Sequence, residues 1–239
     1  TYIDNINQIY KFIQRDQISF PNTVIRFNAK KFPPPPTFGS SLQTIIKCDG
    51  NPDGVPKLVE DAVFYLNNHL HVEGLFRVSG ESKVIKALIT SYNLREHIDL
   101  SSVQDPHAVS CLLKRFLGAM ADPLFPYEYY EILLEFYQLL ADEHPDLWIA
   151  KTAGVLKNFP PANFRLLRVL FDFLSKVAAH SSENLMVPTS LATVIGPNVL
   201  KTKEPPKDLN ELHQANQIVE LFIIHFDEIL SKTEQLVED

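Results

Sequence analysis

The residue best placed to do chemistry in this sequence is Arg77, in the stretch VEGLFRVSG at positions 72–80. A single arginine stands there among apolar residues, and a glycine lies on each side of it at Gly74 and Gly80. Glycine lets the backbone turn sharply, and the Leu-Phe pair before the arginine can pin the loop to a core. We therefore expect a guanidinium held outward on a rigid loop, an arrangement that on its own is compatible with several functions.

The segments on either side of this loop have helical spacing. Pro56 suits a first helical turn, and apolar residues then recur as on one helix face over 58–70; the same spacing returns over 84–92. Gly74 lies where a glycine is expected beyond the end of the first helix. Ser79 or Gly80 can cap the second. Arg77 is thus expected in a short connection between two helices.

The next segment, DPHAVSCLLKRFLGAM, has a clear helix start, with Asp105 as cap and Pro106 at the first helical position. Its apolar residues form one stripe at 100° per residue, which leaves Lys114 and Gly118 together on the opposite side. The remaining helices are expected near 127–142 and 145–157, after the prolines at 160–161, and over 209–230. The predicted fold class is all-α, a single helical-bundle domain.

The N-terminal part of the chain differs from this bundle. Apolar spacing predicts a helix over 2–14, and the four consecutive prolines Pro33 to Pro36 favour a stiff polyproline II segment. This run is either a docking site for an SH3-type module or a rigid strap that holds the N-terminal helix against the domain. We expect residues 1–37 to form this extension and residues 38–239 to form the helical domain.

Composition restricts the class of protein. The chain has 239 residues, 45% of them hydrophobic and 21% charged, with a formal net charge of −7 that argues against nucleic-acid binding. No apolar run has the length of a membrane span, and the first residues lack the pattern of a signal peptide. Only Cys48 and Cys111 are present, so we expect no disulfide framework. We expect a reducing, cytoplasmic setting instead. Both ends look like interior cuts, so we expect a domain of a longer protein, whose other parts recruit it to membranes.

Catalytic constellations of a self-contained enzyme are missing from the sequence. It contains no HExxH, GxSxG, Walker A or Rossmann glycine motif, and its eight histidines are scattered. No carboxylate pair stands out as an acid/base couple. We therefore predict neither a metal site nor an enzyme in its own right.

Three blocks of the sequence together resemble the Rho GTPase-activating protein (RhoGAP) domain family. EGLFRVSG is similar to that family's arginine loop, and LLKRFL followed by DPLFP is similar to its helix with an exposed lysine that ends in a Pro-Leu turn. NLMVPTSLATVIGPNVL resembles its Asn-x-Met segment leading to Gly-Pro-Asn. TFGSSL resembles the start of the family's domain, so the resemblance covers most of the chain between about Phe38 and Leu200.

The resemblance implies a GTP-loaded Rho-family small GTPase, of Rho or Rac type, as partner. Arg77 matches the arginine finger inserted in trans, while GTP and Mg²⁺ are carried by the GTPase, so no cofactor of the chain's own is implied. Lys114 matches a lysine that contacts the acidic switch surface; its alternative is an ordinary solvated lysine. Asn198 matches an asparagine that hydrogen-bonds near the finger loop; its alternative is a turn residue after Pro197. Arg115 matches no family role and is a candidate for the rim of the contact.

Three positions depart from the family pattern. Gly118 stands where an arginine is usual, Ala121 replaces a proline, and Ser190 replaces an asparagine. Gly118 bears on affinity for the GTPase, and none of the three touches the finger. Two hypotheses follow: a monomeric GTPase-activating domain with Arg77 as its finger, or a non-catalytic GTPase-binding scaffold of the same fold. The intact GLFRVSG favours the first and Gly118 the second.

Overall fold

The computed structural model of the chain describes residues 34–238, which belong to one compact unit. The helix predicted over 2–14 and Pro33 lie outside the described residues. Within 34–238 there are helices and no strand, so the predicted all-α class is confirmed. The α-helices are α2 (Leu42–Asp49), α3 (Lys57–Asn67), α4 (Ser82–Asn93), α5 (Pro106–Ala119), α6 (Tyr130–Leu140), α7 (Pro145–Leu156), α8 (Pro161–Ala179), α9 (Ser181–Asn184), α10 (Pro188–Val199), α11 (Leu209–Ile224) and α12 (Phe226–Glu238), with short 3₁₀ turns at Leu100–Ser102 and Tyr127–Tyr129.

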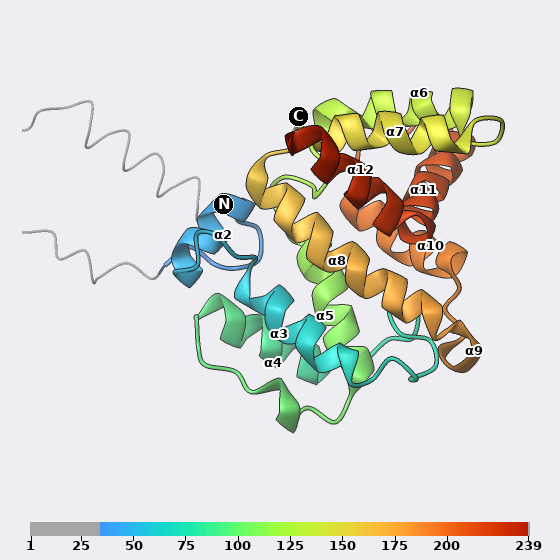
Figure 1. Cartoon of the computed structure of the whole chain (residues 1–239). Helices are drawn as coiled ribbons and strands as arrows, with labels where there is room; N and C mark the ends of the chain where they lie inside the picture. The colour runs from blue at the N-terminus through green and yellow to red at the C-terminus, as the bar shows by residue number, and fades with distance from the viewer. Residues whose placement is uncertain (1–33, 239) are drawn as a thin grey trace, which may run out of the picture. The chain divides into compact units, whose positions relative to one another are not determined.

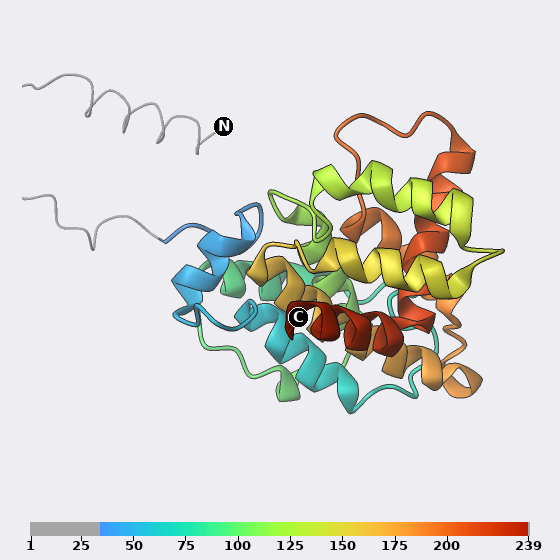
Figure 2. The same cartoon turned by 45° about the horizontal axis from the view of Figure 1, so that its top comes forward.

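The long helix α8 runs through the middle of the domain, and α3, α10, α11 and α12 pack against it (Figures 1 and 2). Its Phe171 is fully buried and belongs to an aromatic cluster with Phe125, Phe222 and Phe226, whose ring centroids lie 5.0–5.9 Å apart in the contacting pairs. Rings this large bury much apolar area and prefer edge-to-face or offset contacts. The cluster therefore joins the C-terminal helices to the centre of the bundle.

Aspartate side chains cap two of the helices, and the cap at Asp105 confirms the prediction from the sequence. Asp105 is the cap of α5, where its carboxylate accepts a hydrogen bond of 3.0 Å from the N–H of His107, and Pro106 is the first helical residue. Asp208 caps α11 in the same way, by accepting 2.8 Å from the N–H of Glu211. These bonds satisfy N–H groups that have no partner inside the helix.

The single helix predicted over 209–230 is wrong, because the chain breaks at His225 into α11 and α12. Phe222 and Phe226, on either side of the break, are both buried in the aromatic cluster. One straight helix would carry its second half away from α8, whereas the break turns α12 back onto α7 and α8. Burial of this apolar stretch thus overrides its helical continuity.

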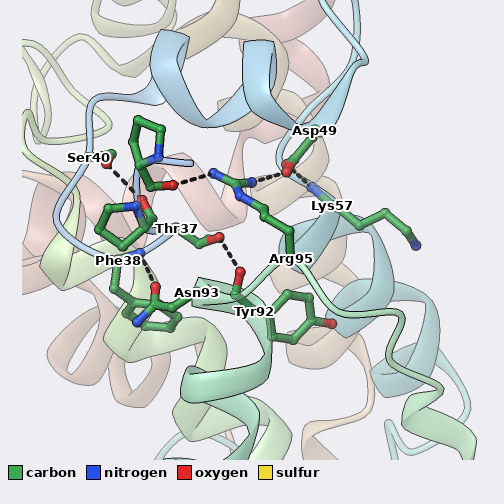
Figure 3. A network of polar contacts seen from close by, with 10 residues as sticks. Thr37, Phe38, Ser40, Asp49, Lys57, Tyr92, Asn93 and Arg95 are labelled. Atoms are coloured by element: carbon green, nitrogen blue, oxygen red, sulfur yellow. Dashed lines mark hydrogen bonds and ion pairs between the residues drawn. The ribbon is translucent and has the colours of Figure 1, made fainter. Parts of the chain in front are cut away.

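The chain before α2 is attached to the C-terminal end of α4 (Figure 3). Thr37 is 2% exposed and its hydroxyl donates 2.8 Å to the carbonyl of Tyr92, while the N–H of Phe38 donates 3.0 Å to the Asn93 side chain. Two segments that are 55 residues apart in the sequence are therefore held together by polar contacts.

Arg95, which follows α4, also binds the chain before α2 and the end of α2 itself (Figure 3). Its guanidinium forms an ion pair with Asp49 at the end of α2 and donates 3.2 Å to the carbonyl of Pro35. The Arg95 backbone has φ +58°, which a non-glycine residue adopts only when its surroundings hold it there. Pro34 and Pro35 are exposed. Docking of an SH3-type module to the proline run stays a prediction, as does the domain boundary at residue 37.

We predict that Arg95→Met lowers the free energy of unfolding by about 3 kcal/mol, because it leaves the carboxylate of Asp49 mostly buried without a counter-charge, with only the N–H of Lys57 still donating to it at 2.8 Å. The side chain of Asp49 is only 7% exposed. Urea unfolding measures the effect, and Arg168→Met is the control. Arg168 pairs with Glu234 at 3.6 Å with both side chains about half exposed, so its loss should cost less than about 1 kcal/mol. Equal losses in the two variants would contradict the role given to Arg95.

Candidate functional site

The arginine loop lies between α3 and α4, as expected, and Phe76 fixes it to the core. Leu75 and Phe76 are fully buried, and the Phe76 ring lies 6.1 Å from that of Phe173 in α8. Phe76 has φ +66°, a conformation that is costly for a residue with a side chain. The next residue, Arg77, is exposed. The strained backbone of a buried phenylalanine thus sets the direction in which the arginine leaves the domain.

Helix α5 holds both backbone polar groups of Phe76. The Phe76 N–H donates 3.2 Å to the hydroxyl of Ser110, which is fully buried, and the Phe76 carbonyl accepts 2.6 Å from the ammonium of Lys114. Ser110 and Lys114 are four residues apart and so lie on the same side of α5. A single helix face therefore fixes the orientation of the peptide groups before and after Phe76.

Two glycines allow the loop to come this close. Gly74 has φ +74°, and a Cβ there would lie 2.7 Å from the side chain of Val78 and 3.6 Å from the guanidinium of Arg77. A Cβ on Gly80 would lie 2.1 Å from the backbone nitrogen of Ala108 in the first turn of α5. The first glycine meets a backbone requirement and the second permits contact between two backbones.

The cap positions predicted for these glycines are wrong. α3 ends at Asn67, well before Gly74, and α4 begins after Glu81 rather than after Ser79 or Gly80. The N–H of Glu81 instead donates 2.7 Å to Asp105, the cap of α5. One carboxylate therefore binds the start of α5 and the start of α4.

Asn184 supports the arginine loop, although its sequence context does not single it out. It is fully buried, and its amide nitrogen donates 2.8 Å to the carbonyls of Leu70 and Val177 while its amide oxygen accepts 2.8 Å from the N–H of Met186. Its own carbonyl accepts 2.7 Å from the N–H of Gly74. Asn184 thus ties the beginning of the arginine loop to the end of α8. The sequence signal was the Asn-x-Met stretch, to which the resemblance attached no role.

Gly118 and Asn198 meet where α5 packs on α10, and Lys114 lies one helical turn before Gly118 on α5. Asn198 lies in the last turn of α10 and donates 3.0 Å to the carbonyl of Val194, so the alternative of a turn residue after Pro197 is wrong. Its side-chain oxygen lies 2.5 Å from the point where a Cβ on residue 118 would stand. Lys114 is half-buried rather than fully exposed. Contact of Lys114 and Asn198 with a partner stays a prediction.

Arg115 is exposed on α5, and among residues 34–238 no hydrogen bond or ion pair links it to the arginine loop. Arg77 and Lys114 likewise form no ion pair with a carboxylate of the described residues. The charges of Arg77 and Lys114 are therefore not compensated by an ion pair within the described residues, and an anionic partner can neutralise them. Within the same residues no cluster of side chains has the composition of a metal site, and no helix is long and apolar enough to cross a membrane.

The fold and this loop define a class of protein. The chain matches the RhoGAP domain family over residues 56–204, which is more than half of its length and includes the arginine loop, α5 and α10. The chain belongs to the RhoGAP domain family.

Individual relatives carry corresponding names. The chain is 34% identical over 226 residues to the Rho GTPase-activating protein gacY of Dictyostelium discoideum, covering 93% of this chain and 31% of that protein. It is 26% identical to human Rho GTPase-activating protein 1, covering 95% of this chain and 55% of that protein. The crystal structure of human Rho GTPase activating protein 15 matches with a TM-score of 0.75 at 28% identity, over 88% of this chain and 99% of that one. The chain thus spans about a third to a half of the length of these two full-length relatives.

We predict that Gly80→Ala destabilises the protein by about 1–3 kcal/mol, because the added methyl group meets the backbone of α5 rather than a movable side chain. The matched control is Gly154→Ala in α7, where a Cβ has no neighbour within 4 Å. There the substitution should stabilise the helix by up to about 1 kcal/mol. Unfolding midpoints in urea give both values, and a neutral Gly80→Ala would show that the loop does not need this approach to α5.

Proposed function

We propose that this chain accelerates GTP hydrolysis by a Rho-family small GTPase and that Arg77 is the arginine it supplies. The observation that carries the proposal is an exposed arginine directly after Phe76, a residue whose side chain is buried and whose two backbone polar groups are both bound by α5. Membership of the RhoGAP family and the names of the relatives support a GTPase of the Rho family as the partner.

The chemistry asked of Arg77 is charge stabilisation. In phosphoryl transfer from GTP, negative charge is spread over the oxygens of the transferred group, and little covalent chemistry is left for protein side chains. A guanidinium is planar, permanently charged and able to donate two parallel hydrogen bonds to such oxygens. GTP and Mg²⁺ belong to the partner, so the chain acts as an activator and needs no cofactor of its own.

The fixed loop matters because ordering a loop on binding costs free energy. Among residues 34–238 the Arg77 guanidinium has no hydrogen bond or ion pair to lose, and the backbone behind it is already held. Most of the entropic cost of ordering the loop therefore arises when the domain folds. Less of the binding free energy is then lost in positioning the arginine on the GTPase.

A second candidate function is a GTPase-binding module of the same fold without activation. The observation in its favour is Gly118, which leaves α5 without a side chain one turn after Lys114, next to Asn198. Loss of a side chain there weakens the contact surface, yet it leaves the Arg77 loop unchanged. We therefore place activation first.

The test is single-turnover GTP hydrolysis by a panel of Rho-family GTPases with the wild-type chain and with Arg77→Ala. We predict that the substitution lowers the rate of hydrolysis by a factor of about 10³–10⁵, which is the contribution of an arginine finger in other GTPases. Binding to a GTPase loaded with a non-hydrolysable GTP analogue should persist. If the wild-type chain binds a GTPase but does not accelerate it, the module without activation is correct. If Arg77→Ala accelerates as well as the wild type, the finger is another residue.

A further inference from the structure

Lys201 lies beside the site described above, and the sequence analysis does not identify it as a site residue. It follows Leu200 at the end of α10, and its ammonium donates 2.7 Å to the carbonyl of Gly118 in α5. The backbone before it is fixed, because Leu200 forms an isolated parallel bridge with Phe125 and the N–H of Phe125 donates 3.1 Å to the carbonyl of Val199. Lys201 therefore contacts α5 from a backbone segment that is fixed by its hydrogen bonds to Phe125.

Gly118 is bound from the α10 side by two residues. Its carbonyl accepts the bond from Lys201, and the space that a Cβ at position 118 would take is occupied by the side-chain oxygen of Asn198, at 2.5 Å. The carbonyl belongs to the last turn of α5, where such groups lack a partner within the helix and carry partial negative charge. A cation is therefore well accommodated at this point.

The ammonium of Lys201 continues the row of positive charge that begins at Arg77. Lys114 binds the carbonyl of Phe76, and Lys201 binds the carbonyl of Gly118, which lies one helical turn after Lys114 on the same face of α5. No carboxylate of residues 34–238 forms an ion pair with Arg77, Lys114 or Lys201. Burial without a compensating carboxylate lowers the pKa of Lys201 from its ordinary value. An anionic group from outside the chain would reverse that effect.

We propose that Lys201 is a GTPase-contacting residue whose ammonium binds a carboxylate on the partner's surface, next to the contact made by Lys114. This inference rests on the proposed function, since it takes a GTPase as the partner. The proposal also changes the interpretation of Gly118. At this point of the proposed contact surface α5 carries no charged side chain, and the positive charge is supplied by Lys201, which follows α10.

The competing explanation is that Lys201 only caps the end of α5. A cap contributes to folding stability, and its loss would leave the affinity for a partner and the salt dependence of that affinity unchanged. A contact with a carboxylate on another protein behaves in the opposite way, because its strength depends on ionic strength. Affinity as a function of salt therefore separates the two.

The experiment measures binding of the 239-residue chain to a Rho-family GTPase loaded with a non-hydrolysable GTP analogue, at several salt concentrations. We predict that Lys201→Met weakens binding by about fivefold at low salt, as for a single exposed ion pair, and that the difference shrinks as salt rises. Lys201→Arg, which keeps the charge, should bind nearly as the wild type does. The matched control is Lys151→Met, which removes an exposed lysine from α7, a helix that packs on α6 and α12.

A Lys201→Met chain with wild-type affinity and wild-type salt dependence overturns the inference and leaves a helix cap. Hydrolysis measured on the same samples keeps this result separate from the proposed function. If the wild type binds in a Lys201-dependent way but does not accelerate hydrolysis, activation fails and the Lys201 contact stands. If the wild type binds no GTPase of the family, both fail.

Discussion

The two hydrogen bonds from α5 to the peptide groups of Phe76 are the constraint on which the rest of the site depends. Ser110 binds the N–H of Phe76 and Lys114 binds its carbonyl, while the Phe76 ring packs against α8. These contacts compensate for a backbone conformation that is otherwise unfavourable for phenylalanine. Everything around the loop follows: Gly80 must lack a side chain for α5 to come close, and Asn184 must fix the other end of the loop. The arginine needs no contact of its own because the residue before it is held.

The same helix also joins the loop to the rest of the proposed contact surface. Lys114 serves the folded domain through Phe76, and its position on α5 also places it one turn before Gly118, which lies against Asn198. A substitution of Lys114 therefore changes the loop and the surface together, and a loss of activity in such a variant does not by itself show a contact with a GTPase. Lys201 is better suited to separate the two, because it touches α5 at Gly118, one turn away from the contact with Phe76.

Local signals in the sequence were sufficient for much of this arrangement. Asp105 and Pro106 mark the start of α5 through a cap contact confined to residues 105–107, and the glycine and apolar neighbours of Arg77 predict its place in a rigid connection between helices. The features that were missed depend on residues far apart in the chain. The break at His225 comes from the packing of α12 on α8, and the importance of Gly80 comes from a backbone 28 positions later. Asn184 binds the carbonyl of Leu70, 114 residues away, which no periodicity could indicate.

The central claim is that the loop is already in its working conformation before any partner binds. The most direct test is a crystal structure of the chain with a Rho-family GTPase that carries GDP, Mg²⁺ and aluminium fluoride, a mimic of the phosphoryl group in transfer. The account predicts that the Arg77 guanidinium lies within hydrogen-bond distance of the fluoride atoms while Phe76 keeps its positive φ and its bonds to Ser110 and Lys114. A complex in which the loop has refolded away from α5, or in which Arg77 points away from the nucleotide, would contradict it.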